Sequence, residues 1–371
     1  MLGSAILMLR MLRFIVPLLT VALVAGCGGS DESGGSGDRA NASSDVNALL
    51  SKTFSNMEKM KSATVDLKVQ IDPRGGSAAS TGPVSARLSG PFESQGENKL
   101  PKIAFTADLS AAGQSFKGGV TWTGEKAYID LQGTAYEVSD MVMKQFIAGY
   151  EQALKQQNSS NQNGNQLLNS LGIDPRGWIK DARNEGEAKV GDTDTVKLTG
   201  SADVKQVIAD LDKLTEKAGT LNVPGSGSSR VQKLTEEQKR EVEQAIKRLD
   251  IEVYTGAEDS ILRRLVVNAD LKDAGDQIDA AIVFDLVFTK VGEEQKFEAP
   301  ANARPFSELL SALDAAGLAD LGLGGGARSG GGQGSGGGSA TPNNVDKYAD
   351  CIKQAKTDDE ARKCASLLSA G

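Results

Sequence analysis

The chain has 371 residues and a formal net charge of −8, with 49 acidic and 41 basic residues and no histidine. The lack of histidine excludes His-based triads, His general bases and His-ligated metal sites, which are the commonest catalytic arrangements in secreted hydrolases. The acidic balance and the scattered lysines argue against a nucleic-acid partner. Composition therefore disfavours an enzyme, and no cofactor or metal is expected.

The first residues predict a secretory signal peptide. Arg10 and Arg13 precede the uncharged run "FIVPLLTVALVAG", which is shorter than the roughly 20 apolar residues that cross a bilayer. The run ends in "VAGC", which resembles the lipobox of bacterial lipoproteins. The resemblance implies that residues 1–26 are removed and that acyl chains on Cys27 hold the protein at the outer face of the cell membrane. The alternative is an ordinary signal whose first mature residue happens to be cysteine.

Two segments rich in glycine and serine predict flexible connections at residues 27–44 and 321–342. The second lacks the Gly-Lys-Ser/Thr ending of a phosphate-binding loop, so we interpret it as a linker. Between them lies a body, residues 45–320, that is long enough for one large core. After the linker, residues 343–371 form a small C-terminal piece.

The C-terminal piece predicts two short helices in a hairpin. Cys351 and Cys364 are its only cysteines, and outside the cell a pair at this spacing is expected to oxidise to a disulfide. Closing so short a loop contributes roughly 3 kcal/mol, which so small a hairpin needs. The alternative, a redox pair, is weak because the spacing is not Cys-x-x-Cys.

The body begins with a helix followed by strands. In "DVNALLSKTFSNMEKMKS", apolar residues recur at helical spacing. Strict alternation then predicts strands at residues 63–72, 102–110, 115–124 and 126–133, with Gly113 and Gly124 in the turns. This pattern is typical of an antiparallel meander with one wet face.

Helical spacing returns at residues 139–156, 202–214 and 235–249, and strands resume at 249–256, 261–272 and 276–291. The expected order is helix, four to six strands, helices, then four or so strands. This order predicts an α+β fold. We expect a curved antiparallel half-barrel with helices laid on its concave face, because a long sheet with one apolar face curls and must cover that face.

Three segments resemble a known family: "LLSKTFSNMEKMKSATVDLKVQI", "GGVTWTGEKAYIDLQGTAYEV" and "GWIKDARNEGEAKVGDTDTVKLTGSADVKQVIADL". They are similar to the LppX, LprA, LprF and LprG lipoproteins, which in turn resemble LolA and LolB. The resemblance covers residues 45 to about 300. It implies a half-barrel whose concave face, lidded by helices, holds the acyl chains of a lipid or lipoglycan. The chain departs from the family in an insert at 218–234, an Asn/Gln-rich loop at 156–166 and the C-terminal hairpin.

Strand alternation assigns the inward face on which such a ligand would lie. The candidate pocket residues are Leu67, Val69, Phe105, Val120, Trp122, Ile129, Val267 and Phe284. The alternative is that these faces pack directly against the helices and leave no cavity.

Three functions follow as hypotheses. The first is a membrane-anchored carrier that binds acyl chains and moves or presents a lipid at the cell envelope. The second is a non-catalytic adaptor or sensor that binds another envelope protein through the same fold. The third is a glycosidase using two carboxylates among Asp130, Glu137 and Asp285. Each of these acids alternates with apolar neighbours and is expected to face water, so the enzyme is the weakest hypothesis.

Overall fold

The computed structural model describes residues 39–75, 79, 82–96, 99–158, 175–210, 235–272 and 279–309. The predicted signal peptide, Cys27, nearly all of the first tether, the glycine-rich linker and both hairpin cysteines lie outside these ranges. The chain divides into two compact units, residues 1–220 with 231–303, and residues 221–230 with 304–371. In the second unit, the described part is β12 (Arg304–Pro305) and a helical turn at 306–309.

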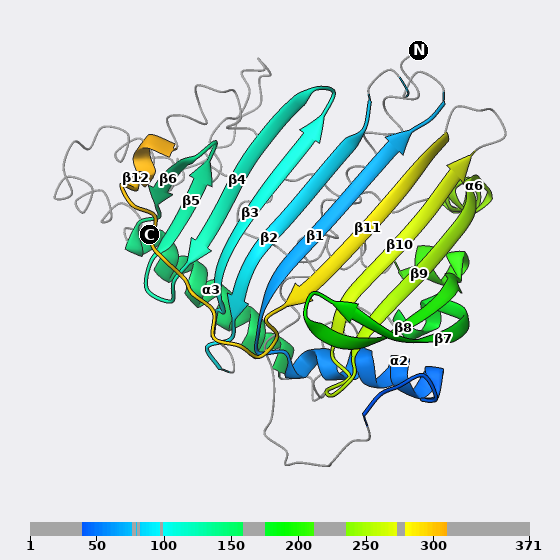
Figure 1. Ribbon diagram of the computed structural model, residues 1–371. Coiled ribbons are helices and arrows are strands. Elements are labelled where there is room, and N and C mark those ends of the chain that lie inside the picture. Colours follow the sequence, from blue (N-terminus) through cyan, green and yellow to red (C-terminus); the bar gives the residue numbers. More distant parts are fainter. Residues whose placement is uncertain are drawn as a thin grey trace. The chain divides into compact units, whose positions relative to one another are not determined.

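The first unit is built on one antiparallel sheet whose neighbouring strands run in the order β6-β5-β4-β3-β2-β1-β11-β10-β9-β8-β7 (Figure 1). Its first strand, β1, pairs with its last, β11, so the two halves of the unit meet at the centre of the sheet. The strands are β1 (Ser62–Pro73), β2 (Val84–Glu93), β3 (Lys102–Ala111), β4 (Gln114–Trp122), β5 (Ala127–Leu131), β6 (Thr134–Glu137), β7 (Ile179–Val190), β8 (Thr193–Ala202), β9 (Ile246–Gly256), β10 (Leu262–Lys272) and β11 (Asp279–Thr289).

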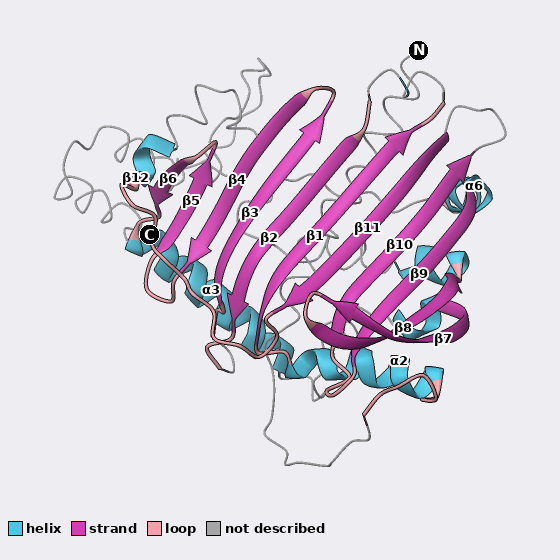
Figure 2. Ribbon diagram, in the orientation of Figure 1, coloured by secondary structure: helices cyan, strands magenta, loops and turns pink. Residues whose placement is uncertain are grey.

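Three α-helices accompany this sheet: α2 (Val46–Ser55), α3 (Asp140–Asn158) and α6 (Glu236–Ala245) (Figure 2). Two 3-10 turns, η1 (Asn56–Lys59) and η3 (Pro175–Trp178), belong to the same unit. Residues 204–210 are also helical. The fold is α+β, as the sequence predicts. Within the described residues of this unit, the sheet is open, because β6 and β7, at the two ends of the order given above, do not pair with each other.

Helix α2 begins where the sequence predicts. A capping hydrogen bond at its first turn and a buried contact with β9 hold it in place. The carboxylate of Asp45 accepts a hydrogen bond from the Ala48 N–H at 2.7 Å, which satisfies one of the free donors at the helix start. The buried hydroxyls of Thr53 and Thr255 lie 2.8 Å apart and join α2 to β9. These contacts hold the apolar side of α2 against one end of the sheet.

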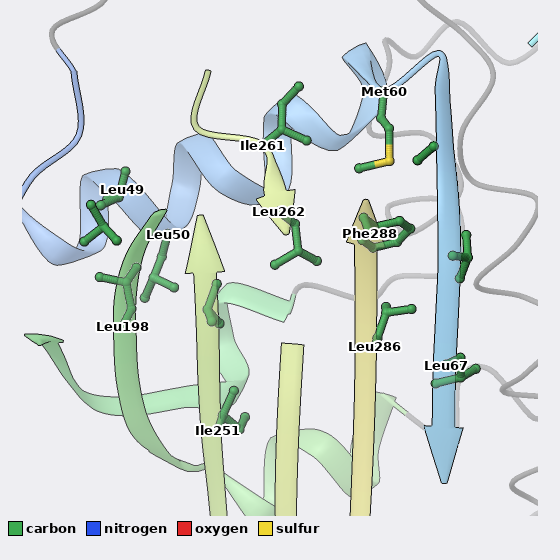
Figure 3. Packing of buried hydrophobic residues seen from close by; sticks show 14 of the residues in the cluster. Leu49, Leu50, Met60, Leu67, Leu198, Ile251, Ile261, Leu262, Leu286 and Phe288 are labelled. Carbon is green, nitrogen blue, oxygen red and sulfur yellow. The ribbon is translucent and has the colours of Figure 1, made fainter. Parts of the chain in front are cut away.

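The register divides the sheet into two faces. In β1, Val65, Leu67 and Val69 lie on the face that packs against α2, and we call this the inner face. Its core joins these residues to Leu49 and Leu50 of α2 and to residues of β8 to β11, as Figure 3 shows. The opposite, outer face is crossed at the strand ends by residues 290–303, where Gln295 contacts Thr64 and Glu93 (Figure 1).

Several elements differ from the sequence prediction. Strands β2, β6, β7 and β8 lie outside the predicted strands. The β7–β8 hairpin stands between α3 and the helix at 204–210, where the predicted order has no strand. The sequence of β2 contains Gly90, with a φ of +147°, followed by Pro91. Proline has no N–H to donate to a neighbouring strand, so these two residues interrupt the alternation from which a strand is predicted.

The helix predicted at 235–249 is wrong beyond Ala245. Ile246 starts β9, since it lies opposite Leu271 of β10, and Leu249 lies opposite Ala269. Pairing with β10 overrides the helical spacing of the local sequence. The turn residues are confirmed: Gly113 and Gly124 have φ values of +74° and +98°.

The helices cover the inner face less completely than the prediction has it. Helix α3 passes behind the lower ends of the strands in Figure 1. Yet none of its described side chains is buried, and Phe146 is 45% exposed. The apolar stripe of α3 is therefore not part of the core.

Candidate functional site

The register places the β1, β10 and β11 members of the predicted set on the inner face. Leu67 lies opposite Leu286, and Val69 lies opposite Phe284. Phe284 in turn lies opposite Val267 of β10. Because residues opposite each other on neighbouring strands point to the same side, these side chains form one continuous apolar row.

The remaining members lie on the same face, on the other side of β1. Phe105 of β3 lies opposite Val120 of β4, and Val120 lies opposite Ile129 of β5. Trp122 follows Val120 by two residues and so faces the same way. The sheet thus brings all eight predicted residues to one face.

These residues differ in how far they are covered. Leu67, Val69, Phe105 and Trp122 are buried, and Leu67 is only 2% exposed. Ile129, Val267 and Phe284 are half-buried. Val120, in contrast, is 39% exposed although it lies directly between Phe105 and Ile129 in the register. The inner face therefore passes from packed core to open apolar surface within β4.

The open part continues along the β3–β4 hairpin. Leu109 is 45% exposed and Phe116, which lies opposite it, is 38% exposed. Gly118 separates Phe116 from Val120, and a Cβ atom at Gly118 would lie 3.3 Å from a ring carbon of Phe116, so this ring extends over Gly118. We call Leu109, Phe116 and Val120 the exposed inner strip. Exposed apolar side chains that adjoin one another in this way mark a site for another apolar surface.

The outer face is polar and ion-paired. Arg87 donates two hydrogen bonds to Asp66, at 2.8 and 2.9 Å, and Arg264 does the same to Asp285. The hydrogen bonds from Arg87 hold the pKa of Asp66 below its ordinary value. This side of the sheet is suited to water, although Val283 on it is 37% exposed. Adjoining exposed apolar side chains are found on the inner face.

A third outer-face cluster joins Lys197, Glu252 and Tyr254. Burial raises the pKa of Glu252, but the hydrogen bonds from Lys197 and Tyr254 outweigh it, so its pKa lies below the ordinary value. The ammonium group of Lys197 also lies 5.5 Å from the centre of the Tyr254 ring. Glu252 is therefore a charged structural group on the solvent side.

The three carboxylates considered for catalysis also lie on the outer face. Asp285 binds Arg264, Glu137 accepts a hydrogen bond from Lys126 at 2.6 Å, and Asp130 accepts one from the Gly133 N–H at 3.0 Å. Each has a structural partner of its own. No group of three or more acidic or cysteine side chains that could hold a metal is found in the described part of the chain.

Sequence reasoning left Leu109 and Phe116 out of the candidate set although both belong to the alternating pattern of their strands. Their signal was present, since each is spaced by an even number of residues from a chosen neighbour. What the pattern lacked was any measure of coverage, because alternation assigns a face but not what packs on it.

This chain resembles the lipoproteins LprF and LppX. The crystal structure of LprF from Mycobacterium bovis is 15% identical, covers 71% of this chain and 100% of its own, and has a TM-score of 0.36. That of LppX from Mycobacterium tuberculosis is 13% identical, covers 68% and 98%, and has a TM-score of 0.31. No model of a known protein family and no curated protein matches the chain. Sequence identities this low say nothing about which ligand the chain binds.

None of the helices in the described ranges is long and apolar enough to cross a membrane.

Proposed function

We propose that this chain is a lipoprotein, anchored at the extracytoplasmic face of the cell membrane, that binds the acyl chains of a lipid or lipoglycan on the inner face of its sheet and moves or presents that lipid at the cell envelope. The observation that carries the proposal is the exposed inner strip, Leu109, Phe116 and Val120, on the same face as the packed core. The predicted acylation of Cys27 would keep this face close to its lipid source.

The physical need for such a face is large. Two acyl chains of about sixteen carbons lose on the order of 20 kcal/mol or more when they leave the bilayer for water, at about 0.8 kcal/mol per methylene. A protein surface that carries them across the envelope must replace much of that burial. The strip supplies apolar area that the fold itself does not use.

The experiment uses the chain from residue 28 onward, exported without the cysteine that would be acylated. The protein is purified without detergent, and the lipid bound to it is measured by native mass spectrometry. The wild-type protein is expected to retain lipid. Val120→Trp is expected to retain little lipid while its melting temperature stays near the wild-type value, because the side chain it enlarges is 39% exposed.

The matched control is Ser115→Trp, on the outer face of the same strand. It adds the same side chain where no acyl chain is expected, so it should retain lipid as the wild type does. Wild-type protein with neither copurified lipid nor binding to added lipid would overturn the proposal in favour of a protein-binding adaptor. Equal loss of lipid in both variants would show that the strip is not the binding surface.

A further inference from the structure

The indole nitrogen of Trp122 is buried without a hydrogen-bond partner. Among the described side chains, only this Nε1 atom and the hydroxyl of Thr195 combine burial with the lack of a partner. An indole N–H can only donate, and Trp122 as a whole is 6% exposed, so water does not readily satisfy it. A buried donor of this kind needs an acceptor that the chain does not provide.

Trp122 lies where the exposed inner strip meets the core. It ends β4, two residues after Val120, which corresponds to roughly 7 Å along the strand. Its neighbours across the sheet are Ile103 and Ala127, both apolar. A chain of methylenes lying along the strip from Phe116 past Val120 therefore leads to the side chain of Trp122, which follows on the same face.

The other tryptophan of the chain shows the opposite arrangement. The indole N–H of Trp178 donates to the carboxylate of Asp210 at 2.8 Å. Since the chain has two tryptophans, one indole is satisfied within the protein and the other is not. Trp178 thus offers a matched control for any experiment on Trp122.

We propose that the Trp122 indole N–H donates a hydrogen bond to an acyl-ester carbonyl oxygen of the bound lipid. This inference rests on the proposed function and adds to it the residue that recognises the ester linkage of the bound lipid. A neutral carbonyl suits the place because the inner-face neighbours Ile103, Val120 and Ala127 supply no cation to balance a phosphate or a free carboxylate. The bond would fix how far the ester lies along β4.

The test compares two neutral probes, dipalmitoylglycerol and dihexadecylglycerol, which share chain length but differ in having ester or ether linkages. The chain from residue 28 is titrated with each lipid as wild type, Trp122→Phe and Trp178→Phe. Wild type and Trp178→Phe are expected to bind the diester about three- to tenfold more tightly than the diether, because one neutral hydrogen bond changes the affinity by about that factor. Trp122→Phe should bind both lipids alike.

A second measurement separates recognition from a structural role. Without ligand, Trp122→Phe should melt at or above the wild-type temperature, because it removes an unpaired buried donor, whereas Trp178→Phe should melt lower because Asp210 loses a donor. In Trp178→Phe, Trp122 is the sole tryptophan, and its emission should shift to the red on binding the diester but not the diether.

The outcomes separate this inference from the function on which it rests. Wild-type protein that binds neither lipid would overturn the proposed function. Two results would overturn only the role of Trp122. In the first, the wild type binds both lipids without preference. In the second, the wild type prefers the diester and Trp122→Phe keeps that preference. If Trp122→Phe did not fold, an emission from Trp122 that is unchanged by the diester would overturn it in the same way.

Discussion

A carboxylate placed on the exposed inner strip should abolish lipid binding while leaving the fold intact. Val120→Asp is the sharpest such change, because Val120 is 39% exposed and lies between Phe105 and Ile129 in the register. In the free protein, the new carboxylate can stay in contact with water. A bound acyl chain would cover it, so its desolvation is a cost of binding and much less of folding.

The magnitudes follow from the exposed fraction. Full burial of a valine side chain is worth about 1.5–3 kcal/mol, so the exposed 39% leaves about 0.6–1.2 kcal/mol to be gained from the ligand. Covering a carboxylate costs at least about 1–3 kcal/mol, the cost for an unpaired neutral polar group, because the carboxylate is charged. The sum is at least about 1.6–4.2 kcal/mol, which corresponds to a loss of affinity of at least about 15- to 1,000-fold. The stability lost with the buried part of the side chain is about 0.9–1.8 kcal/mol.

The assay is binding of dipalmitoylglycerol to Val120→Asp beside urea unfolding of the same protein, with two controls. Ser115→Asp places the carboxylate on the outer face of β4 and should bind as the wild type does. Leu198→Ala, in the core of β8 at a site 1% exposed, should cost about 2–5 kcal/mol of unfolding free energy yet bind lipid normally while folded. Affinity of Val120→Asp equal to that of the wild type would refute the assignment of the strip as the binding surface.

Three further predictions concern other parts of the chain. Because Arg87 holds the pKa of Asp66 below its ordinary value of 3.8, their pair stabilises the protein above that pH and ceases to do so as the pH falls through the lowered pKa. Asp66→Asn should thus unfold about 0.5–1 kcal/mol more easily at neutral pH, and this difference should vanish as the pH falls below the lowered pKa of Asp66. A difference that stays constant with pH would contradict this. Cys27→Ser should leave an unprocessed or soluble protein, and a mature-length mutant still in the membrane fraction would show that Cys27 is not the anchor. If Cys351 and Cys364 are bridged, neither should be alkylated in denatured, non-reduced protein, so labelling of both would exclude the disulfide.

Local pattern was sufficient for part of this fold. The alternation of Val65, Leu67 and Val69 predicted both the strand β1 and the side it buries, because successive side chains of a strand point to opposite faces whatever the partner strand is. The same reasoning placed Phe284 of β11 correctly. The helix α2 followed from its apolar spacing.

Other elements depended on contacts that are distant in the sequence. In β7, charged residues and Gly186 obscure any alternation, and pairing with β8 makes the segment a strand. Ile246 lies in a stretch with helical spacing, but its place opposite Leu271 puts it in β9. Strand pairing of this kind supplies hydrogen-bond partners to the backbone N–H and C=O groups, and these partners come from segments that are distant in the sequence.

The sequence by itself determined the class of the protein and the side of the sheet on which a ligand could lie. Val120 and Trp122 belong to one alternating pattern, and the pattern assigns both to the same face. Only the tertiary structure decided that Val120 is 39% exposed while Trp122 is 6% exposed with an indole N–H that lacks a partner. The reason is physical: the direction of a side chain is set by the backbone of its own strand, whereas its coverage depends on which remote segments pack against it.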